Sequence, residues 1–249
     1  MPTIAPPRRK TVSLIVPAYK QQQSIVRNLK QLLKVLVNIR YDYEVIVVVD
    51  GNADKTAQTI KKAALKKVKC FQYEHNRGKF YAIRLGMSKS QGEIVMFIDA
   101  GMEIDPNGIS MLLEHLEWYQ ADIIVGSKRH PASKVIYPLK RKILSYGYYY
   151  LVRLLFNLKV KDTQAGIKVF RKNVLGKILP KLKENKFCGD LEILVVAKHC
   201  GYQRIFEAPI NLTYSPDLFS SAIKPRAIWD IFLDTLVIWY RTYIQHAYK

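Results

Sequence analysis

The sequence has few cysteines, no long apolar run and no leader-like start. Its three cysteines, Cys70, Cys188 and Cys200, form no Cys-x-x-Cys pair, which excludes a disulfide framework and favours free thiols in a reducing compartment. No run of about 18 uncharged apolar residues occurs, which argues against a membrane-spanning helix. The first ten residues lack the apolar segment of a secretory signal. We therefore expect the protein to stay on the cytoplasmic side.

Acidic residues are also scarce. Twenty Asp and Glu against forty Lys and Arg give a formal net charge of +20 in 249 residues. The 49% hydrophobic content is globular and excludes a disordered chain. A surplus of this size indicates an anionic partner, which can be a nucleic acid, an anionic membrane surface or a phosphorylated substrate.

Strand and helix patterns alternate along the first half of the chain. Apolar strands are predicted at 12–16, 44–49, 68–73 and 94–99, and amphipathic helices at 24–38 (with Ser24 as the cap), 55–67 and 79–88. Continuous apolar strands between such helices are typical of a parallel sheet that is covered on both faces. We expect an α/β fold with a Rossmann-like, mostly parallel central sheet, in which ligands bind at the carboxyl edge of the strands.

The second half is basic and aromatic. Nine Lys and Arg and no acid lie between residues 128 and 161, and within this stretch residues 143–158 are apolar and aromatic-rich but interrupted by Arg153. Residues 226–245 show helical spacing of apolar residues, with Asp230, Asp234, Arg241 and Gln245 on the opposite face. We predict a flexible segment at 1–10, a main domain at 11–222 with a membrane-facing helix at about 138–158, and a C-terminal amphipathic helix at 223–249.

Carboxylates stand at the ends of two predicted strands. Asp50 precedes a Gly-Asn turn, and Asp99 is followed four residues later by Glu103. Oxygen ligands of this kind bind a ribose, or Mg²⁺ and Mn²⁺ against a diphosphate. The plainer alternative is that these aspartates cap the turns or helices that follow.

These residues belong to a series of motifs in a fixed order. The first half contains Val-Ser-Leu-Ile-Val-Pro-Ala-Tyr19, the Asp50 turn, His-Asn-Arg-Gly-Lys79 and Phe-Ile-Asp-Ala100. The second half contains Gly-Ser-Lys-Arg129, Asp162-Thr-Gln-Ala-Gly-Ile-Lys-Val-Phe-Arg171 and Gly-Asp190-Leu-Glu. The series resembles the family 2 glycosyltransferases with the GT-A fold, specifically their dolichyl- and polyprenyl-phosphate mannosyltransferase and glucosyltransferase branch. The likeness extends over about residues 11–245.

The resemblance implies an inverting transfer of mannose or glucose from a nucleotide diphosphate sugar, of the GDP-mannose or UDP-glucose type. The acceptor would be a polyprenyl or dolichyl phosphate, and the enzyme would bind the cytoplasmic face of the membrane peripherally. It implies these nucleotide-sugar contacts: Pro17, Ala18, Tyr19, Gln21, Asp50, Asn76, Gly78, Lys79, Asp99 and Ala100.

The same resemblance implies the residues around the reacting groups. Asp190, Arg129, Asp162 and Gln164 would lie at the catalytic centre. Arg129, Arg141, Arg153 and Lys168 would bind the acceptor phosphate, because cationic side chains match phosphate oxygens. Each of these cations could alternatively be an ordinary solvated charge. A phosphate monoester is already anionic at neutral pH, so the acceptor needs no strong general base.

The chain departs from the family pattern at several positions. Gly101 replaces the second acid of the usual Asp-x-Asp, so we predict that Asp99 and Glu103 form the metal pair for Mg²⁺ or Mn²⁺. Lys20-Gln21 stands where Asn-Glu is common, and Val49 replaces the first acid of Asp-Asp-Gly-Ser. The fold prediction does not depend on these positions.

Three other functions remain open. The chain could be a GT-A enzyme that glycosylates a hydroxyl group of a glycolipid or of a cell-surface polysaccharide precursor. It could also be an inactive protein that binds nucleotide sugars, because its Asp-x-Asp is incomplete. The charge would permit nucleic-acid binding, but no motif for it is present, and we expect none.

Overall fold

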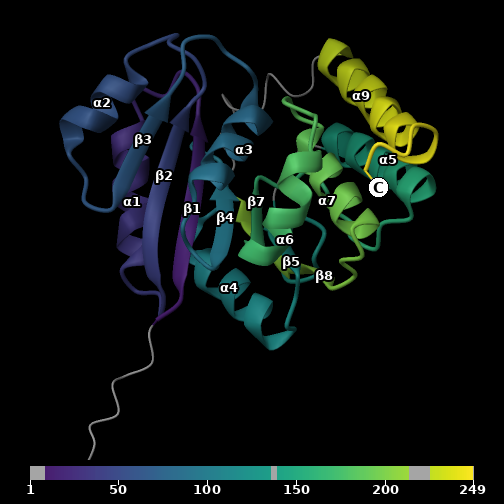
Figure 1. Ribbon diagram of the computed structural model, residues 1–249, viewed down its shortest axis with the longest axis horizontal. Helices are drawn as coiled ribbons and strands as arrows, with labels where there is room; N and C mark the ends of the chain where they lie inside the picture. The colour runs from purple at the N-terminus through teal and green to yellow at the C-terminus, as the bar shows by residue number, and fades with distance from the viewer. Residues whose placement is uncertain (1–8, 136–138, 213–224, 249) are drawn as a thin grey trace, which may run out of the picture.

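The computed structural model describes residues 9–135, 139–212 and 225–248, and within them a central seven-stranded sheet carries helices on both faces (Figure 1). Its strand order is β3-β2-β1-β4-β7-β5-β8, and β7 runs antiparallel to both of its neighbours. The strands are β1 (Thr11–Ala18), β2 (Asp42–Val49), β3 (Val68–Gln72), β4 (Ile94–Ile98), β5 (Ile123–Ser127), β7 (Ile167–Arg171) and β8 (Ile205–Pro209), with a separate pair β6 (Lys134–Val135) and β9 (Asn211–Leu212). The mostly parallel α/β sheet expected from the sequence is confirmed.

The register of the strands determines where the polar residues emerge. β1 and β2 are parallel and in step, with Ala18 opposite Val49, and β4 is parallel to β1 on its other side. Because parallel strands end at the same edge, Tyr19, Asp50 and Asp99 leave the sheet side by side. This carboxyl edge is the expected position of the site.

Two apolar cores lie on the two faces of the sheet. One is formed with α1 (Ile25–Leu36), α2 (Thr56–Ala63) and α4 (Ile109–Trp118), and the other with α3 (Lys79–Lys89), α6 (Lys172–Ile178) and α7 (Gly189–His199). Two 3₁₀ turns, η1 (Pro106–Gly108) and η2 (Leu179–Lys181), precede α4 and follow α6.

Two details of the helix predictions were wrong. The helix expected over 55–67 ends at Ala63, where the next residue, Ala64, takes a left-handed conformation with φ of 44°. Ser24 does stand at the N-cap of α1, but its hydroxyl makes no capping bond there. It donates instead to the side-chain oxygen of Gln21 at 2.6 Å.

The helices α5 (Leu139–Phe156) and α9 (Pro225–Tyr243) pack next to each other on the α7 side of the molecule (Figure 1). The inward residues of α9 are Thr235, Ile238 and Thr242, whereas large apolar side chains such as Trp229 and Leu233 point outward. A helix is present over Pro225–Tyr243 within the segment predicted at 223–249, and several of its large apolar side chains are exposed. No helix within 9–135, 139–212 and 225–248 is long and apolar enough to cross a membrane.

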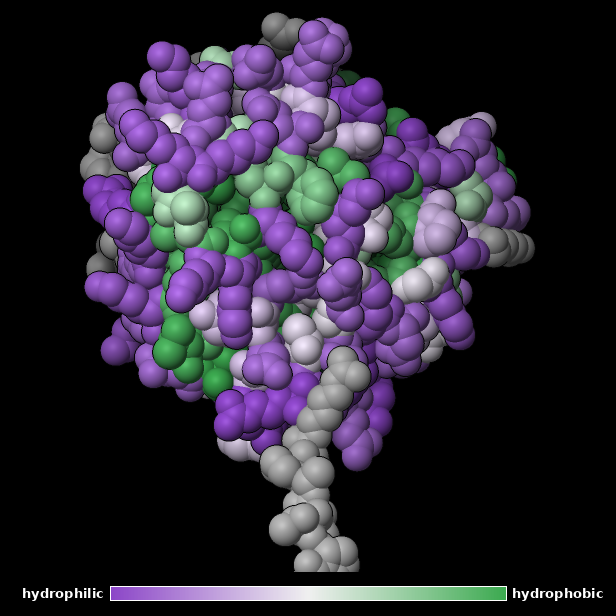
Figure 2. All heavy atoms as spheres, turned by 60° about the vertical axis from the view of Figure 1, so that its left-hand side comes forward, coloured by the Kyte–Doolittle hydropathy of each residue, from purple (hydrophilic) through white to green (hydrophobic). Residues whose placement is uncertain are grey.

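The opposite flank of the molecule has a different surface. Figure 2 brings the side of α1, α2 and β3 forward, and hydrophilic residues cover most of it. Between residues 55 and 69 the exposed lysines are Lys55, Lys61, Lys62, Lys66, Lys67 and Lys69. These six of the forty basic residues therefore lie away from α5 and α9.

The close contact between α3 and α7 gives a test of the packing. A Cβ added at Gly189 would lie 2.0 Å from Cγ of Phe80, which is fully buried. We expect Gly189→Ala to cost about 1–3 kcal/mol in the free energy of unfolding through overpacking. The melting temperature, followed by circular dichroism, should fall by several degrees.

Gly176→Ala is the matched control, since a Cβ there meets nothing within 4 Å and the residue is exposed in a helix. This variant should keep or slightly raise the melting temperature, because alanine favours a helix over glycine. Equal melting temperatures for both variants would contradict the described α3–α7 contact.

Candidate active site

The carboxylate of Asp50 organises the loop between β3 and α3. It is 3% exposed and accepts hydrogen bonds from the Tyr73 hydroxyl at 2.8 Å and the Asn76 side-chain amide at 3.0 Å. The backbone N–H groups of Arg77 and Gly78 donate to it at 2.7 and 3.1 Å. Burial, followed by the bond to Asp50, raises the pKa of Tyr73. In this structure the oxygens of Asp50 are thus engaged by the loop itself.

A second loop holds the start of α3. The carbonyl of Asn185 accepts from the N–H groups of Phe80 and Tyr81 at 2.9 and 3.1 Å, which satisfies two donors of the helix N-terminus. Gly78, with φ of 102°, lies so close that a Cβ there would be 2.4 Å from the Asn185 oxygen. The backbone around Lys79 is therefore fixed from both sides.

Lys79 joins two aspartates at the carboxyl edge. Its Nζ lies 2.7 Å from Oδ1 of Asp99 and 3.7 Å from Oδ2 of Asp190. Burial alone would lower the pKa of Lys79, but the charges of Asp99 and Asp190, with a further contribution from Glu103, raise it above the ordinary value. Lys79 is therefore a fixed cation at the edge of the sheet.

Asp190 and Lys168, the buried residues of this cluster, are less accessible than we expected from the sequence. Asp190 is 2% exposed, and Lys168, the second residue of β7, is 0% exposed. The Lys168 ammonium donates to the Ala165 carbonyl at 3.0 Å and to Oδ1 of Asp190. Our expectation that Lys168 binds the acceptor phosphate does not fit this burial, since solvent does not reach the side chain.

Asp99 and Glu103 offer hard oxygen ligands for a divalent cation. The Asp99 side chain is 41% exposed, and the field of Glu103 reaches Lys79, which contacts Asp99. Within the described ranges no group of three or more His, Cys, Asp or Glu is arranged to hold a metal by itself. The donor set suits Mg²⁺ or Mn²⁺ when phosphate oxygens complete the coordination.

The remaining residues that were predicted to contact the nucleotide sugar also meet at this edge. Pro17 and Ala18 are buried at the end of β1, and Tyr19 is 44% exposed beyond it. The N–H of Gln21 donates to the Thr56 hydroxyl at 2.9 Å. The Ala100 carbonyl accepts from an asparagine amide of α1 at 2.9 Å. These positions form one continuous rim with Asp50 and Asp99.

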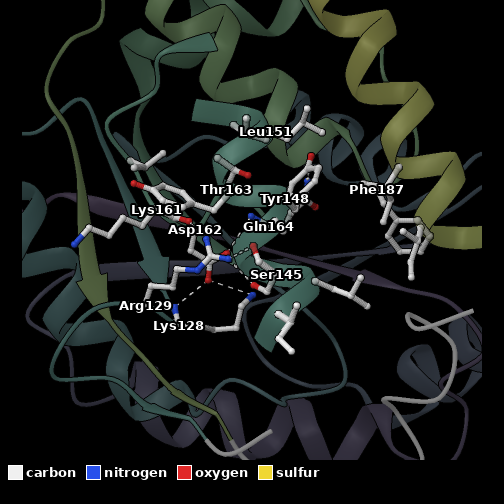
Figure 3. Close-up of a pocket in the computed structure, with 18 of the residues that line it drawn as sticks. Lys128, Arg129, Ser145, Tyr148, Leu151, Lys161, Asp162, Thr163, Gln164 and Phe187 are labelled. Atoms are coloured by element: carbon white, nitrogen blue, oxygen red, sulfur yellow. Dashed lines mark hydrogen bonds and ion pairs between the residues drawn. The ribbon is translucent and has the colours of Figure 1, made fainter. Parts of the chain in front are cut away.

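A cavity of about 610 Å³ lies between α5, α9 and the loop before β7 (Figure 3). Its walls are largely apolar and come from both helices, and its polar part contains Lys128, Arg129, Lys161, Asp162 and Gln164. Among the apolar lining residues are Ile143, Leu144, Leu151, Val152, Phe187, Ile228, Ile231 and Phe232.

Arg129 is the central cation of this cavity (Figure 3). Its guanidinium donates to the carbonyl of Lys161 and to the carbonyl and hydroxyl of Ser145. It also lies 4.9 and 5.1 Å from the ring centroids of Tyr146 and Tyr149. The guanidinium therefore ties the loop before β7 to α5.

Asp162 shapes the loop beside Arg129. It accepts from the N–H of Lys128 at 2.9 Å and that of Gln164 at 3.2 Å, and the Lys128 ammonium lies 3.2 Å away. Burial opposes ionisation of Asp162, but the Lys128 charge outweighs it and lowers the pKa of the carboxyl. The Gln164 amide donates to the Tyr148 hydroxyl at 3.2 Å, which extends the polar cluster to α5.

Of the other two predicted acceptor cations, Arg153 does not join this cluster. Arg153 is exposed on α5, is absent from the cavity lining, and donates to the Tyr149 hydroxyl at 2.8 Å. Arg141 lies in the first turn of α5, but its side chain lies outside the described residues. Our expectation for Arg153 is thus not supported by its position.

The cavity and the carboxyl edge are joined by one loop. The Gly166 carbonyl, two residues beyond Gln164, accepts from the Asp99 N–H at 3.1 Å. A Cβ at Gly166 would lie 2.1 Å from Oδ2 of Asp99, so this approach requires glycine. The loop that lines the cavity is therefore held directly against Asp99.

Sequence reasoning missed several residues of the site. Lys128 and Lys161 belong to the basic stretch and Tyr148 to the aromatic segment, so a signal for them was present. Phe187 and Asn185 lie in a short connecting segment where no pattern points to function.

Known proteins provide an independent comparison. The sequence profile described as Glycosyl transferase family 2 matches residues 13–179. A dolichyl-phosphate beta-glucosyltransferase of Drosophila melanogaster is 30% identical over 96% of this chain and 77% of its own length. The human protein of the same name is 29% identical over 92% and 74%.

Solved structures agree in fold. Mannosyl-3-phosphoglycerate synthase from Rubrobacter xylanophilus aligns with a TM-score of 0.70 at 15% identity, covering 94% of this chain and 74% of its own. Glucosyl-3-phosphoglycerate synthase from Mycobacterium tuberculosis, in complex with Mn²⁺, UDP and phosphoglyceric acid, aligns with a TM-score of 0.67 at 15% identity, covering 92% and 78%. The profile covers more than half of the chain and agrees with the motif order and the sheet, so the chain belongs to glycosyltransferase family 2.

Proposed function

We propose that this enzyme transfers glucose from UDP-glucose to a dolichyl or other polyprenyl phosphate, with inversion at the anomeric carbon. The observation that carries the proposal is the apolar cavity between α5 and α9, whose polar part contains Lys128, Arg129 and Lys161 and which opens beside the edge at Asp99. A lipid phosphate has the matching chemistry, an anionic head on an apolar chain. The relatives in the comparison are named glucosyltransferases, which favours glucose over the mannose donor also considered from the sequence.

The reaction is a single displacement. A phosphate oxygen of the acceptor attacks C1 of glucose, the bond from C1 to the diphosphate oxygen breaks, and UDP leaves from the opposite side. An α-linked donor then gives a β-linked product. The acceptor is ionised at neutral pH because its second pKa is about 6, so no general base is needed. This agrees with the burial of Asp190 between two lysines, where it cannot reach a substrate hydroxyl.

The leaving diphosphate would be stabilised at the carboxyl edge. Asp99 and Glu103 would hold Mg²⁺ or Mn²⁺, and the bound cation supplies positive charge to the departing UDP. Lys79 adds a second, permanent cation beside Asp99. Tyr19, Gln21, Asp50 and the rim around them would bind the nucleotide through backbone and side-chain groups.

We propose peripheral binding of α5 and α9 to the membrane that holds the acceptor. Their outward side chains include Ile143, Tyr150, Leu154, Trp229, Leu233 and Tyr240, all exposed by 42% or more. Aromatic and aliphatic residues on a helix that lies in the interface gain free energy by leaving water. Basic residues of the 128–161 stretch add attraction to anionic lipids. The expected location at the cytoplasmic face is part of this proposal.

The metal assignment predicts two different losses. Asp99→Asn should lower kcat/KM for transfer by about 10²-fold or more, because the charge stabilising UDP is lost. Glu103→Gln should raise the Mn²⁺ concentration needed for half-maximal activity. Asp105→Asn is the control, since Asp105 accepts from the Asn107 N–H at 3.0 Å and caps η1. Wild-type Mn²⁺ titration in Glu103→Gln would refute the metal pair.

The acceptor assignment predicts a selective change in KM. Arg129→Gln should raise the KM for a short polyprenyl phosphate by about tenfold or more, since a charged hydrogen bond contributes about 1.5–3 kcal/mol. Arg129→Lys should restore part of this, because lysine keeps the charge without the planar fork. The exposed Arg204, bonded to the Tyr119 carbonyl, serves as control in Arg204→Gln. A matching rise in the KM for UDP-glucose would place Arg129 in the donor site instead.

The membrane assignment is tested by sedimentation with vesicles. Trp229→Ser should weaken binding to anionic vesicles about tenfold or more, because a large apolar side chain no longer leaves water. Trp118→Ser is the matched control: Trp118 is 73% exposed, but it ends α4 at the far end of the molecule (Figure 1). Salt should reduce binding to anionic vesicles. Equal binding by the two variants would contradict the assignment of α9 to the membrane.

A further inference from the structure

Lys168 is a lysine inside the protein core. It lies in β7, pairs across the sheet with Phe97 of β4, and its Nζ is 5.3 Å from the centroid of that ring. Its ammonium has two hydrogen-bond acceptors, the Ala165 carbonyl and Asp190. Burying a charge is costly unless it is paired, so a lysine at this position needs its aspartate. A purely apolar residue would pack there without such a requirement.

Lys168 is one end of a row of alternating charges. Asp190 contacts Lys168 through Oδ1 and approaches Lys79 through Oδ2, and Lys79 contacts Asp99. Exposure of the side chains rises along this row, from 0% for Lys168 through 4% for Asp190 and 23% for Lys79 to 41% for Asp99. The row therefore runs from the core to the open edge of the sheet.

The ion pair between Lys168 and Asp190 affects whether the Lys79 ammonium lies closer to Asp99 or to Asp190. With Lys168 charged, Asp190 has a close partner and stays 3.7 Å from the Lys79 ammonium, which remains nearer to Asp99 at 2.7 Å. If the Lys168 charge were removed, Lys79 would be the nearest cation left to neutralise a nearly buried Asp190. The attraction would draw the Lys79 ammonium inward and away from Asp99.

We propose that Lys168 is a positioning residue: through Asp190 it keeps the Lys79 ammonium at Asp99, where the diphosphate of the donor departs. This role differs from the acceptor contact expected from the sequence, and it rests on the proposed function. Lys168 itself touches neither substrate. Its substitution should therefore change the donor side of the reaction and leave acceptor binding alone.

The test uses Lys168→Met, which keeps the length of the side chain and removes its charge. We expect kcat to fall by about 10²-fold, the loss typical of a catalytic group misplaced by about 1 Å. The affinity for UDP with Mn²⁺, measured by titration calorimetry without acceptor, should fall as well. The KM for polyprenyl phosphate should stay within about twofold, and Lys168→Arg should recover much of both losses because it restores the charge.

Two further variants separate positioning from simple stability. Lys172→Met removes a β7-adjacent lysine whose ammonium donates to the Ser90 carbonyl and hydroxyl at 2.7 and 2.6 Å, so it should change the melting temperature without changing UDP affinity. The double variant Lys168→Met/Asp190→Asn removes both buried charges and frees Lys79 from the inward pull. If Lys168→Met does not fold, UDP binding by this double variant close to that of the wild type supports the proposal, and a complete loss overturns it.

The remaining outcomes are decisive as well. Wild-type kcat and UDP affinity in folded Lys168→Met would overturn the positioning role. A raised KM for polyprenyl phosphate with unchanged UDP affinity would assign Lys168 to the acceptor after all, and would also overturn it. Failure of the proposed function looks different, because the wild-type enzyme would then bind UDP with Mn²⁺ but transfer no glucose to polyprenyl phosphate.

Discussion

The arrangement of the site depends on one buried carboxylate. Asp50 ends β2 with 3% exposure, and a charge in such a place must be compensated by donors. The donors are two side chains and two backbone amides between residues 73 and 78. Asp50, at the end of β2, therefore fixes the loop that follows β3. That loop leads directly into α3, whose first residue is Lys79. The position of the cation at the edge is thus a consequence of Asp50.

Charge compensation continues from Lys79 in two directions, toward the core and toward the open edge of the sheet. Inward, Asp190 and Lys168 neutralise each other inside the core. Outward, Asp99 balances Lys79, and its backbone is joined to Gly166 at the end of the loop that lines the cavity. On that loop Asp162 is compensated by Lys128 in turn. The paired charges at the carboxyl edge and those at the cavity are therefore two groups, which the backbone hydrogen bond between Asp99 and Gly166 joins.

The sequence predicted the parts of this structure that follow from local pattern. Buried parallel strands are continuously apolar, so β1, β2 and β4 and the residues at their ends were found within a few positions. The antiparallel β7 was not predicted as a strand, because Lys168 interrupts its apolar pattern and a lysine is by default a solvated charge. Helical spacing also predicted the apolar side of α9, but a local pattern does not show what covers that side. The cavity joins segments far apart in the chain, which no local pattern can show.

The burial of Asp190 has a consequence for the choice of acceptor. A hydroxyl acceptor must lose a proton as it attacks, and this requires an accessible base near the sugar. The carboxylate of Asp190, which the family likeness placed at the catalytic centre, is 2% exposed, contacts Lys168 and approaches Lys79. A phosphate acceptor arrives already ionised and needs cations, which the cavity supplies in Lys128, Arg129 and Lys161. Its lipid chain needs apolar surroundings, and the walls of the cavity that come from α5 and α9 are largely apolar. The buried carboxylate, the basic floor and the exposed aromatic helices therefore favour the same class of substrate.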